Sequence, residues 1–172
     1  AASNLFKWEG GGSYHFEIPG TKRWTLNTTT KGGFLAPAKV DSFFNFFNGG
    51  MTGIKGYPFY SVEGSRFALW EATFRFPLFT EKNIPIGWTL FQNSYLGLMF
   101  QIGDAWNEMA ALDLKKSIGI QWRINGFSFY NFPTAIGLEI HQGIDRFTKN
   151  IKGQEITYGH EPTYYFSLLF NY

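Results

Sequence analysis

The sequence contains no cysteine, which excludes disulfide bonds and cysteine-based metal sites. Charged residues are scarce, because they make up 16% of the 172 residues against about 25% in a typical soluble domain. The formal net charge is only +2, so we do not expect nucleic acid as a partner. No stretch approaches the ~18 consecutive apolar residues of a membrane-spanning helix, and such a helix is excluded.

Helix-forming segments are also scarce, whereas aromatic residues are abundant. Only residues 106–116 have a helical composition, and this segment is short enough to be a loop with a single helical turn. Aromatic residues make up 20% of the chain, with 20 Phe among them. This composition excludes disorder and favours an all-β protein.

Apolar and polar residues alternate with period two over most of the chain, which is the pattern of β-strands with two different faces. In the third such segment Trp70 and Phe74 share one face, and Glu71 and Arg75 share the other. The segments cover residues 5–19, 23–35, 67–78, 88–103, 117–131, 136–141 and 163–172. Many of them reach the ~9–11 residues with which a tilted strand spans a bilayer.

The connections between these seven segments alternate between short and long. Short periplasmic turns and long extracellular loops are typical of an outer-membrane β-barrel. The polar face consists mainly of Thr, Asn, Gln, Ser and Gly, which suits a barrel lumen. We therefore predict an antiparallel transmembrane β-barrel in the bacterial outer membrane, in contact with the lipid bilayer. The short turns are residues 18–22, 79–85 and 131–134, and the long loops are residues 36–65, 104–116 and 145–162.

On this prediction, the apolar face of each strand forms the outer wall, with Leu98, Phe100, Ile124 and Leu138 near the middle of the membrane. A soluble β-sandwich with carbohydrate-binding aromatic residues is an alternative, because its strands alternate in the same way. Such a sandwich would carry many Lys and Glu on its polar face, and few occur here.

The number of strands bears on how much of a barrel the chain provides. Single-chain bacterial barrels have an even number of strands, whereas seven segments alternate here. An open sheet would also leave unpaired edges in lipid, where unsatisfied backbone groups are costly. We therefore expect residues 1–172 to be the C-terminal portion of a larger barrel, with the remaining N-terminal strands as its partner.

Several motifs follow one another in an order that occurs in a known family. The long loop ends in residues 49–58 (GGMTGIKGYP), and the strand after it contains residues 74–78 (FRFPL). The next strand ends in residues 103–106 (GDAW), and the chain closes on an aromatic residue. This succession resembles the C-terminal barrel of the bacterial surface antigen family. That superfamily includes BamA-like outer-membrane assembly factors and two-partner secretion transporters.

The resemblance implies a barrel of about 16 strands, of which this chain would supply the last seven. It implies that residues 36–65 form a loop inserted into the lumen, with Ile54, Lys55, Gly56 and Tyr57 at its tip. It also implies a role in the insertion or translocation of outer-membrane or secreted proteins, with unfolded client proteins as partners. A barrel that is only an anchor or a pore for an upstream domain is the alternative within this fold.

The sequence differs from the family pattern at two positions. The family usually carries Arg where Lys55 stands and Asp where Gln101 stands. We interpret the two differences as linked, because Arg forms a bidentate pair with a carboxylate, whereas Lys is a point donor that can bond to an amide oxygen. Glu71, Arg75 and Glu139 are further wall residues that could brace the loop.

The loop is also rich in phenylalanine, with Phe43, Phe44, Phe46 and Phe47, which would form an exposed apolar patch on a solvated tip. We therefore expect the loop to fold back onto the inner wall. A buried ammonium group needs acceptors. We expect the Lys55 ammonium to lie within hydrogen-bonding reach of at least one of three wall residues, which are Gln101, Glu71 and Glu139.

The last segment alternates towards the C-terminus with apolar residues at every second position. A lipid-facing strand accounts for this pattern, and the resemblance adds an assembly signal that the barrel assembly machinery reads as an exposed strand edge. The residues of this signal are Phe166, Leu168, Phe170 and Tyr172.

No group of residues in the sequence indicates catalysis. His15, His141 and His160 are scattered, and no serine lies in a G-x-S-x-G context. His141 follows Glu139 on the same face, which indicates a polar pair in the lumen rather than a metal site. We therefore expect no enzyme activity, no metal and no cofactor.

Overall fold

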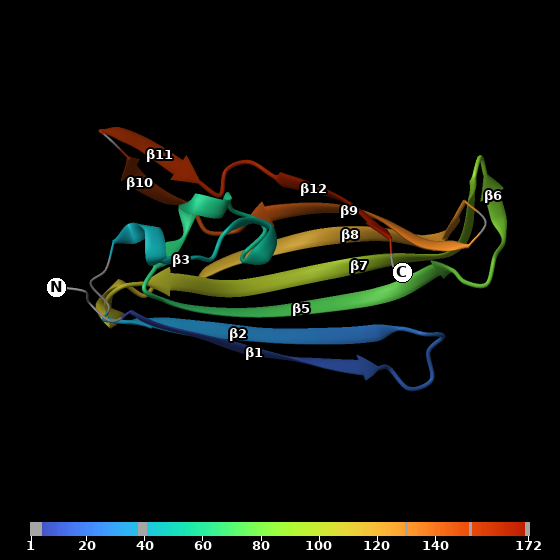
Figure 1. Cartoon of the computed structure of the whole chain (residues 1–172), viewed down its shortest axis with the longest axis horizontal. Helices are drawn as coiled ribbons and strands as arrows, with labels where there is room; N and C mark the ends of the chain where they lie inside the picture. Colours follow the sequence, from blue (N-terminus) through green and yellow to red (C-terminus); the bar gives the residue numbers. More distant parts are fainter. Residues whose placement is uncertain (1–4, 38–40, 130, 152, 171–172) are drawn as a thin grey trace.

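The structure is a computed structural model that describes residues 5–37, 41–129, 131–151 and 153–170. It is all-β and antiparallel, and seven long strands form one sheet in the order β1-β2-β5-β7-β8-β9-β12 (Figure 1). These strands are β1 (Phe6–Glu17), β2 (Thr25–Ala36), β5 (Arg66–Phe79), β7 (Thr89–Trp106), β8 (Lys115–Ser128), β9 (Phe132–Gly143) and β12 (Thr163–Phe170). Each of the seven alternating segments of the sequence therefore corresponds to one long strand.

The sheet is open, because β1 and β12 are its two edges and do not pair with each other. Within the described part of the chain there is no closed barrel. Each long strand pairs with the long strand that follows it in sequence. The short strand β6 (Ile84–Ile86) pairs with β7 only. Among the described residues, no helix has the length and apolar character needed to cross a membrane.

Several connections differ from the sequence-based expectation. The turn expected at residues 131–134 does not extend to Pro133 and Thr134, because both already pair with β8. Proline is tolerated there because it lies next to the start of the strand. The connection expected to be a plain turn at residues 79–85 contains β6, which pairs with β7 around a turn with Gly87 at φ +58°.

The long connections also contain structure that the alternation alone did not indicate. Residues 145–162 include a hairpin of β10 (Phe147–Ile151) and β11 (Gln154–Tyr158). The loop between β7 and β8 is shorter than expected, because β7 extends to Trp106, and it holds one 3-10 turn, η4 (Met109–Ala111). The loop between β2 and β5 holds β3 (Phe46–Phe47), β4 (Glu63–Gly64), η1 (Ser42–Phe44), η2 (Gly50–Thr52) and η3 (Phe59–Ser61).

The connections are arranged by length at the two ends of the sheet. The loop between β2 and β5, hereafter the long loop, lies at one end together with β10 and β11, and β6 lies at the other end (Figure 1). The long loop folds back over one face, hereafter the inner face. Two small apolar clusters lie between the loop and the inner face and form the core. The first contains Leu35, Phe46, Val62, Phe67 and Ala105, and the second contains Ile54, Tyr57 and Leu69.

The opposite face of the sheet, hereafter the outer face, is apolar and bare. Leu98, Ile120 and Ile140 are neighbours in the register of β7, β8 and β9, and their exposed fractions are 50%, 52% and 51%. Leu138 is also exposed, and Phe100 and Ile124 are partly exposed. None of the four residues expected on the outer wall lies inside a packed core.

Candidate functional site

Strand register brings polar residues of the inner face together from positions far apart in sequence. Glu71 of β5 lies opposite Gln101 of β7, which lies opposite Ser117 of β8. In a second row Gln121 of β8 lies opposite Glu139 of β9. Because directly opposite side chains have Cβ atoms about 4.5–5.5 Å apart, each row forms a continuous polar surface. The tip of the long loop docks on these two rows.

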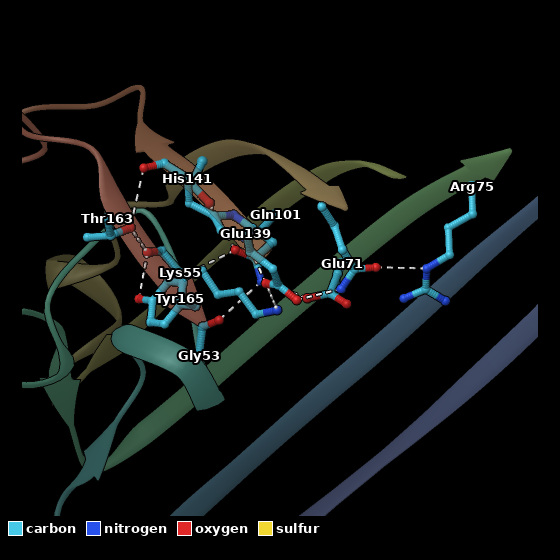
Figure 2. Close-up of polar contacts among 11 residues, drawn as sticks. Gly53, Lys55, Glu71, Arg75, Gln101, Glu139, His141, Thr163 and Tyr165 are labelled. Atoms are coloured by element: carbon cyan, nitrogen blue, oxygen red, sulfur yellow. Dashed lines mark hydrogen bonds and ion pairs between the residues drawn. The ribbon is translucent and has the colours of Figure 1, made fainter. Parts of the chain in front are cut away.

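Lys55 is the central residue of the docked tip (Figure 2). Its ammonium Nζ lies 2.5 Å from Glu139 Oε2, and the two side chains are 14% and 12% exposed. Its backbone N–H donates to Gln101 Oε1 (2.8 Å), and its backbone oxygen accepts from Thr163 Oγ1 and from the Tyr165 hydroxyl. The ammonium, the backbone N–H and the backbone carbonyl of Lys55 are therefore all bonded to residues of β7, β9 or β12.

The expected contact between the Lys55 ammonium and an acceptor of the wall is present, and the acceptor is Glu139. The interpretation that the ammonium bonds to the Gln101 amide is wrong, because Gln101 contacts the Lys55 backbone instead. The physical reason is charge. A buried ammonium is stabilised far more by a carboxylate than by a neutral amide oxygen, and Glu139 is within reach.

Glu139 is surrounded by donors on three sides. Besides Lys55, it accepts from Gln121 Nε2 (2.5 Å) and contacts His141 Nε2 (3.0 Å). Because an ionised carboxylate only accepts hydrogen bonds, this contact places the His141 proton on Nε2. The ring is fully buried where Gly119 leaves space, since a Cβ at residue 119 would lie 2.2 Å from His141 Nδ1.

Gln101 uses both ends of its amide to link the loop to the wall. Its Oε1 accepts from the Lys55 N–H and from Ser117 Oγ (2.9 Å). Its Nε2 donates to the Gly53 carbonyl (3.1 Å) and to Glu71 Oε2 (2.6 Å). An aspartate at this position could accept but not donate, so the contacts to Gly53 and Glu71 would be lost.

The other three residues of the tip motif fix its depth against the wall. Ile54 and Tyr57 are fully buried against Leu69. Gly56 permits close approach, because a Cβ there would lie 2.6 Å from both the Gly143 nitrogen and Ser117 Cβ. The motif therefore combines two buried apolar side chains, Ile54 and Tyr57, with one cation and one residue that lacks a side chain.

The Tyr57 hydroxyl ties the tip to two further segments. It lies 2.9 Å from the Lys116 carbonyl oxygen and 2.8 Å from the Asp145 carbonyl oxygen, and it accepts from the Asp145 N–H (3.1 Å). Burial raises the pKa of Tyr57 to about 12. The phenol is therefore neutral and can donate at any ordinary pH. The ring fits because residues 143 and 159 are glycines, where a Cβ would lie 2.7 Å and 3.0 Å from it.

A second ion pair lies where β7 ends and β8 begins. Lys115 Nζ lies 3.0 Å from Asp104 Oδ1 and 4.8 Å from the centre of the Phe147 ring. Asp104, which was expected in an external loop, is buried at the end of β7, and its second oxygen accepts from the Asp113 N–H (2.7 Å). Asn48 of the long loop donates to the Ala68 and Asp104 carbonyls.

Not every predicted residue joins the tip. Arg75 lies apart from the tip motif and donates from Nε to Gln121 Oε1 (3.0 Å), so it does not hold the loop directly (Figure 2). Glu71 is linked to the tip through Gln101. Phe166, Leu168 and Phe170 are exposed on the outer face of β12, and Tyr172 lies outside the described residues.

The long loop folds back onto the inner face as expected, but two of its four phenylalanines stay in solvent. Phe46 is buried and Phe47 is partly buried, but Phe43 and Phe44 are 80% and 42% exposed. They lie on η1, which Asp41 caps by accepting from the Phe43 N–H (2.9 Å). Phe46 already fills the space beside Phe67 and Val62, so the two outer rings contact each other instead.

Five further residues contribute to the site although the sequence analysis did not select them as bracing residues. They are Gln121, His141, Ser117, Thr163 and Tyr165. All five have the same alternation parity as a predicted inner-face residue on their strand, which is the only signal that the sequence offers for them.

The described residues contain no group of three or more histidine, cysteine, aspartate or glutamate side chains that could hold a metal ion. Comparison with protein families, with curated proteins and with solved structures finds no match for the chain.

Proposed function

We propose that this chain forms the C-terminal part of the wall of an outer-membrane β-barrel, and that its long loop braces the lumen. One observation carries the proposal: a single sheet has an apolar face that is bare and a polar face on which a loop is docked. A soluble protein buries the apolar face of a sheet and leaves the polar face in water. The arrangement is reversed here, as in barrels whose outer wall contacts lipid.

The soluble sandwich explains this arrangement less well. A sandwich packs the apolar face of one sheet against that of another, about 10 Å away. Among the described residues the two additional sheets are two-stranded ribbons, β3-β4 and β10-β11. The β3-β4 ribbon belongs to the loop on the inner face, so it leaves the outer face uncovered.

The open edges support the view that further strands complete the wall. Residues of β1 and β12 each have one strand neighbour, so half of their backbone groups along each edge lack a sheet partner. In lipid such edges are costly, and closure removes them. The resemblance to the bacterial surface antigen family suggests about 16 strands in all, with the long connections outside the cell and the short ones in the periplasm.

The same resemblance gives the activity that we propose, which is the insertion or translocation of outer-membrane or secreted proteins. The docked loop would hold β7, β8, β9 and β12 in one rigid body, so that movement is confined to the edges of the sheet. Unfolded clients and the barrel assembly machinery are the partners that this role requires.

The experiment uses the full-length protein in its own membrane. The first measurement is whether it fractionates with the outer membrane and migrates faster on gels before heating than after. The second is the level of other outer-membrane barrels after depletion, with rescue by wild type, by Lys55→Ala and by Lys22→Ala, a matched control in the exposed turn between β1 and β2.

We expect rescue by wild type and by Lys22→Ala, and weaker rescue by Lys55→Ala. If depletion leaves the other barrels unchanged while the protein itself is a heat-modifiable barrel, the assembly role is wrong and the anchor or pore remains. If the protein stays soluble without detergent, the membrane assignment itself is wrong.

A further inference from the structure

The inner face contains a second polar region, at the opposite end from the docked loop. An open pocket of about 420 Å³ lies over five neighbouring strands near the short turns. Arg75 of β5 and Arg123 of β8 are among its lining residues, and Tyr95 lies on β7 between their strands. Next to it on β7, Gly97 lies opposite both Arg75 and Gln121. Glu17, Arg23, Thr25 and Asn125 complete the lining.

The two arginines of the lining are held by neutral groups. Arg75 Nε donates to Gln121 Oε1, and Arg123 Nε donates to Asn125 Oδ1, both at 3.0 Å. Gln121 is itself fixed, because its Nε2 donates to Glu139. Each guanidinium is therefore oriented through Nε, and with respect to the described residues its two terminal Nη groups remain available as paired donors.

The charge of these arginines is not compensated by a contact. Among the described residues, neither Arg75 nor Arg123 has a carboxylate within ion-pairing distance, whereas Arg23 is paired with Glu81 at 2.5 Å. Arg75 is repelled by Arg123 and attracted from farther away by Glu71 and Glu139. Glu17 is an exposed carboxylate in the lining, and within the described residues it has no ion-pairing partner. Two partly buried guanidinium groups that line one pocket repel each other, and an anion between them would relieve this repulsion.

We propose that this pocket binds an oxyanion, the phosphate or carboxylate group of a small solute, between Arg75 and Arg123. Guanidinium groups with free Nη edges match the geometry of both oxyanions, and the bonds are charge-assisted. The hydroxyl groups of Tyr95 and Thr25 lie in the same lining and supply neutral donors. The site is separate from the docked loop, and its occupancy does not depend on any assembly activity.

The test is calorimetric titration of the full-length protein in detergent with inorganic phosphate, with acetate and with chloride at constant ionic strength. We expect saturable binding of phosphate or acetate, and the anion that binds identifies the ligand class. Loss of one charge-assisted contact should weaken this binding about tenfold in Arg75→Gln and in Arg123→Gln. Arg75→Lys keeps the charge and should bind with intermediate strength.

Two control variants should affect anion binding differently. Glu17→Gln removes a competing carboxylate and should tighten binding, whereas Arg146→Gln, an exposed arginine of the connection between β9 and β10, should leave it unchanged. Each variant is checked for heat-modifiable migration before titration. The proposal is overturned if neither oxyanion binds saturably, if chloride binds equally well, or if every arginine variant that folds binds as wild type does.

Discussion

The outer and inner faces of the main sheet are built from the same strands but follow different rules. On the outer face, Leu98, Ile120 and Ile140 share a row and need only an apolar environment. On the inner face, Gln101 has four hydrogen-bonding partners, and each of them is one particular atom. Outer-face residues are therefore exchangeable within a chemical class, whereas an inner-face residue depends on its neighbours one by one.

The largest effect should come from removing the cation at the centre of the inner face. Lys55→Ala leaves Glu139 buried without its charged partner, which typically costs about 3–5 kcal/mol. We expect this loss in the free energy of loop docking, measured as faster proteolytic nicking within residues 36–65 while the barrel stays heat-modifiable. The double variant Lys55→Met with Glu139→Gln should recover much of the loss. Unchanged nicking in Lys55→Ala would rule out the bracing role.

On the outer face, replacing an apolar residue by a charged one should lower stability, whereas replacing it by another apolar residue should not. On the proposed membrane assignment, Ile120→Arg would place a charge in lipid and should lower the free energy of unfolding in bilayers by about 2–4 kcal/mol if it lies at the midplane. Asn27→Arg, on the inner face of β2, should cost less than half as much, and Ile120→Val should be nearly neutral. Equal costs for the two arginine variants in urea titrations would contradict the assignment of the faces.

A smaller effect should follow from filling the space beside the tip. In Gly143→Ala the new Cβ would lie 2.7 Å from the Tyr57 ring, and overpacking of this kind costs about 1–3 kcal/mol. The matched control is Gly12→Ala on β1, where a Cβ would meet nothing within 4 Å. We expect hydrogen exchange to accelerate in residues 53–57 of the first variant only. Acceleration in neither would mean that the tip can shift without loss.

The smallest effect concerns one hydroxyl group. Tyr57→Phe removes the hydroxyl whose single proton is shared between the Lys116 and Asp145 carbonyls and should cost about 1 kcal/mol of docking. Because burial raises the pKa of Tyr57 from 10.0 to about 12, its contribution is complete below pH 10 and is lost as the pH rises through 12. Pulse proteolysis with an alkaline protease should show this loss in wild type. The same pH dependence in Tyr57→Phe would assign it to another group.

The outer face could be predicted almost completely, because alternation with period two depends only on the sequence and on the environment of each face. The expected side of Leu98, Phe100, Ile124 and Leu138 agrees with the structure. Strand ends were less predictable where a proline lies next to the start of a strand, as Pro133 does. The β10-β11 hairpin was missed because its strands are short and lie within a segment interpreted as loop.

The inner face was predictable only in part. That Lys55 would find a wall acceptor follows from the cost of burying an ammonium group, but the choice of Glu139 does not. It depends on the register that sets Gln121 opposite Glu139 and on Gly119, which makes room for His141. Register shifts of a single residue would reverse which face each side chain occupies, and no local pattern encodes the alignment of distant strands.

The sequence by itself determined the strands, their two faces, and the alternation of short and long connections. These features are local, because each depends on spacing along the chain. The tertiary structure alone decided which residues hold Lys55, that Tyr57 is tied to Lys116 and Asp145, and that Arg75 and Arg123 share a pocket. These features depend on contacts between segments that are distant in sequence, and only the strand pairing brings those segments together.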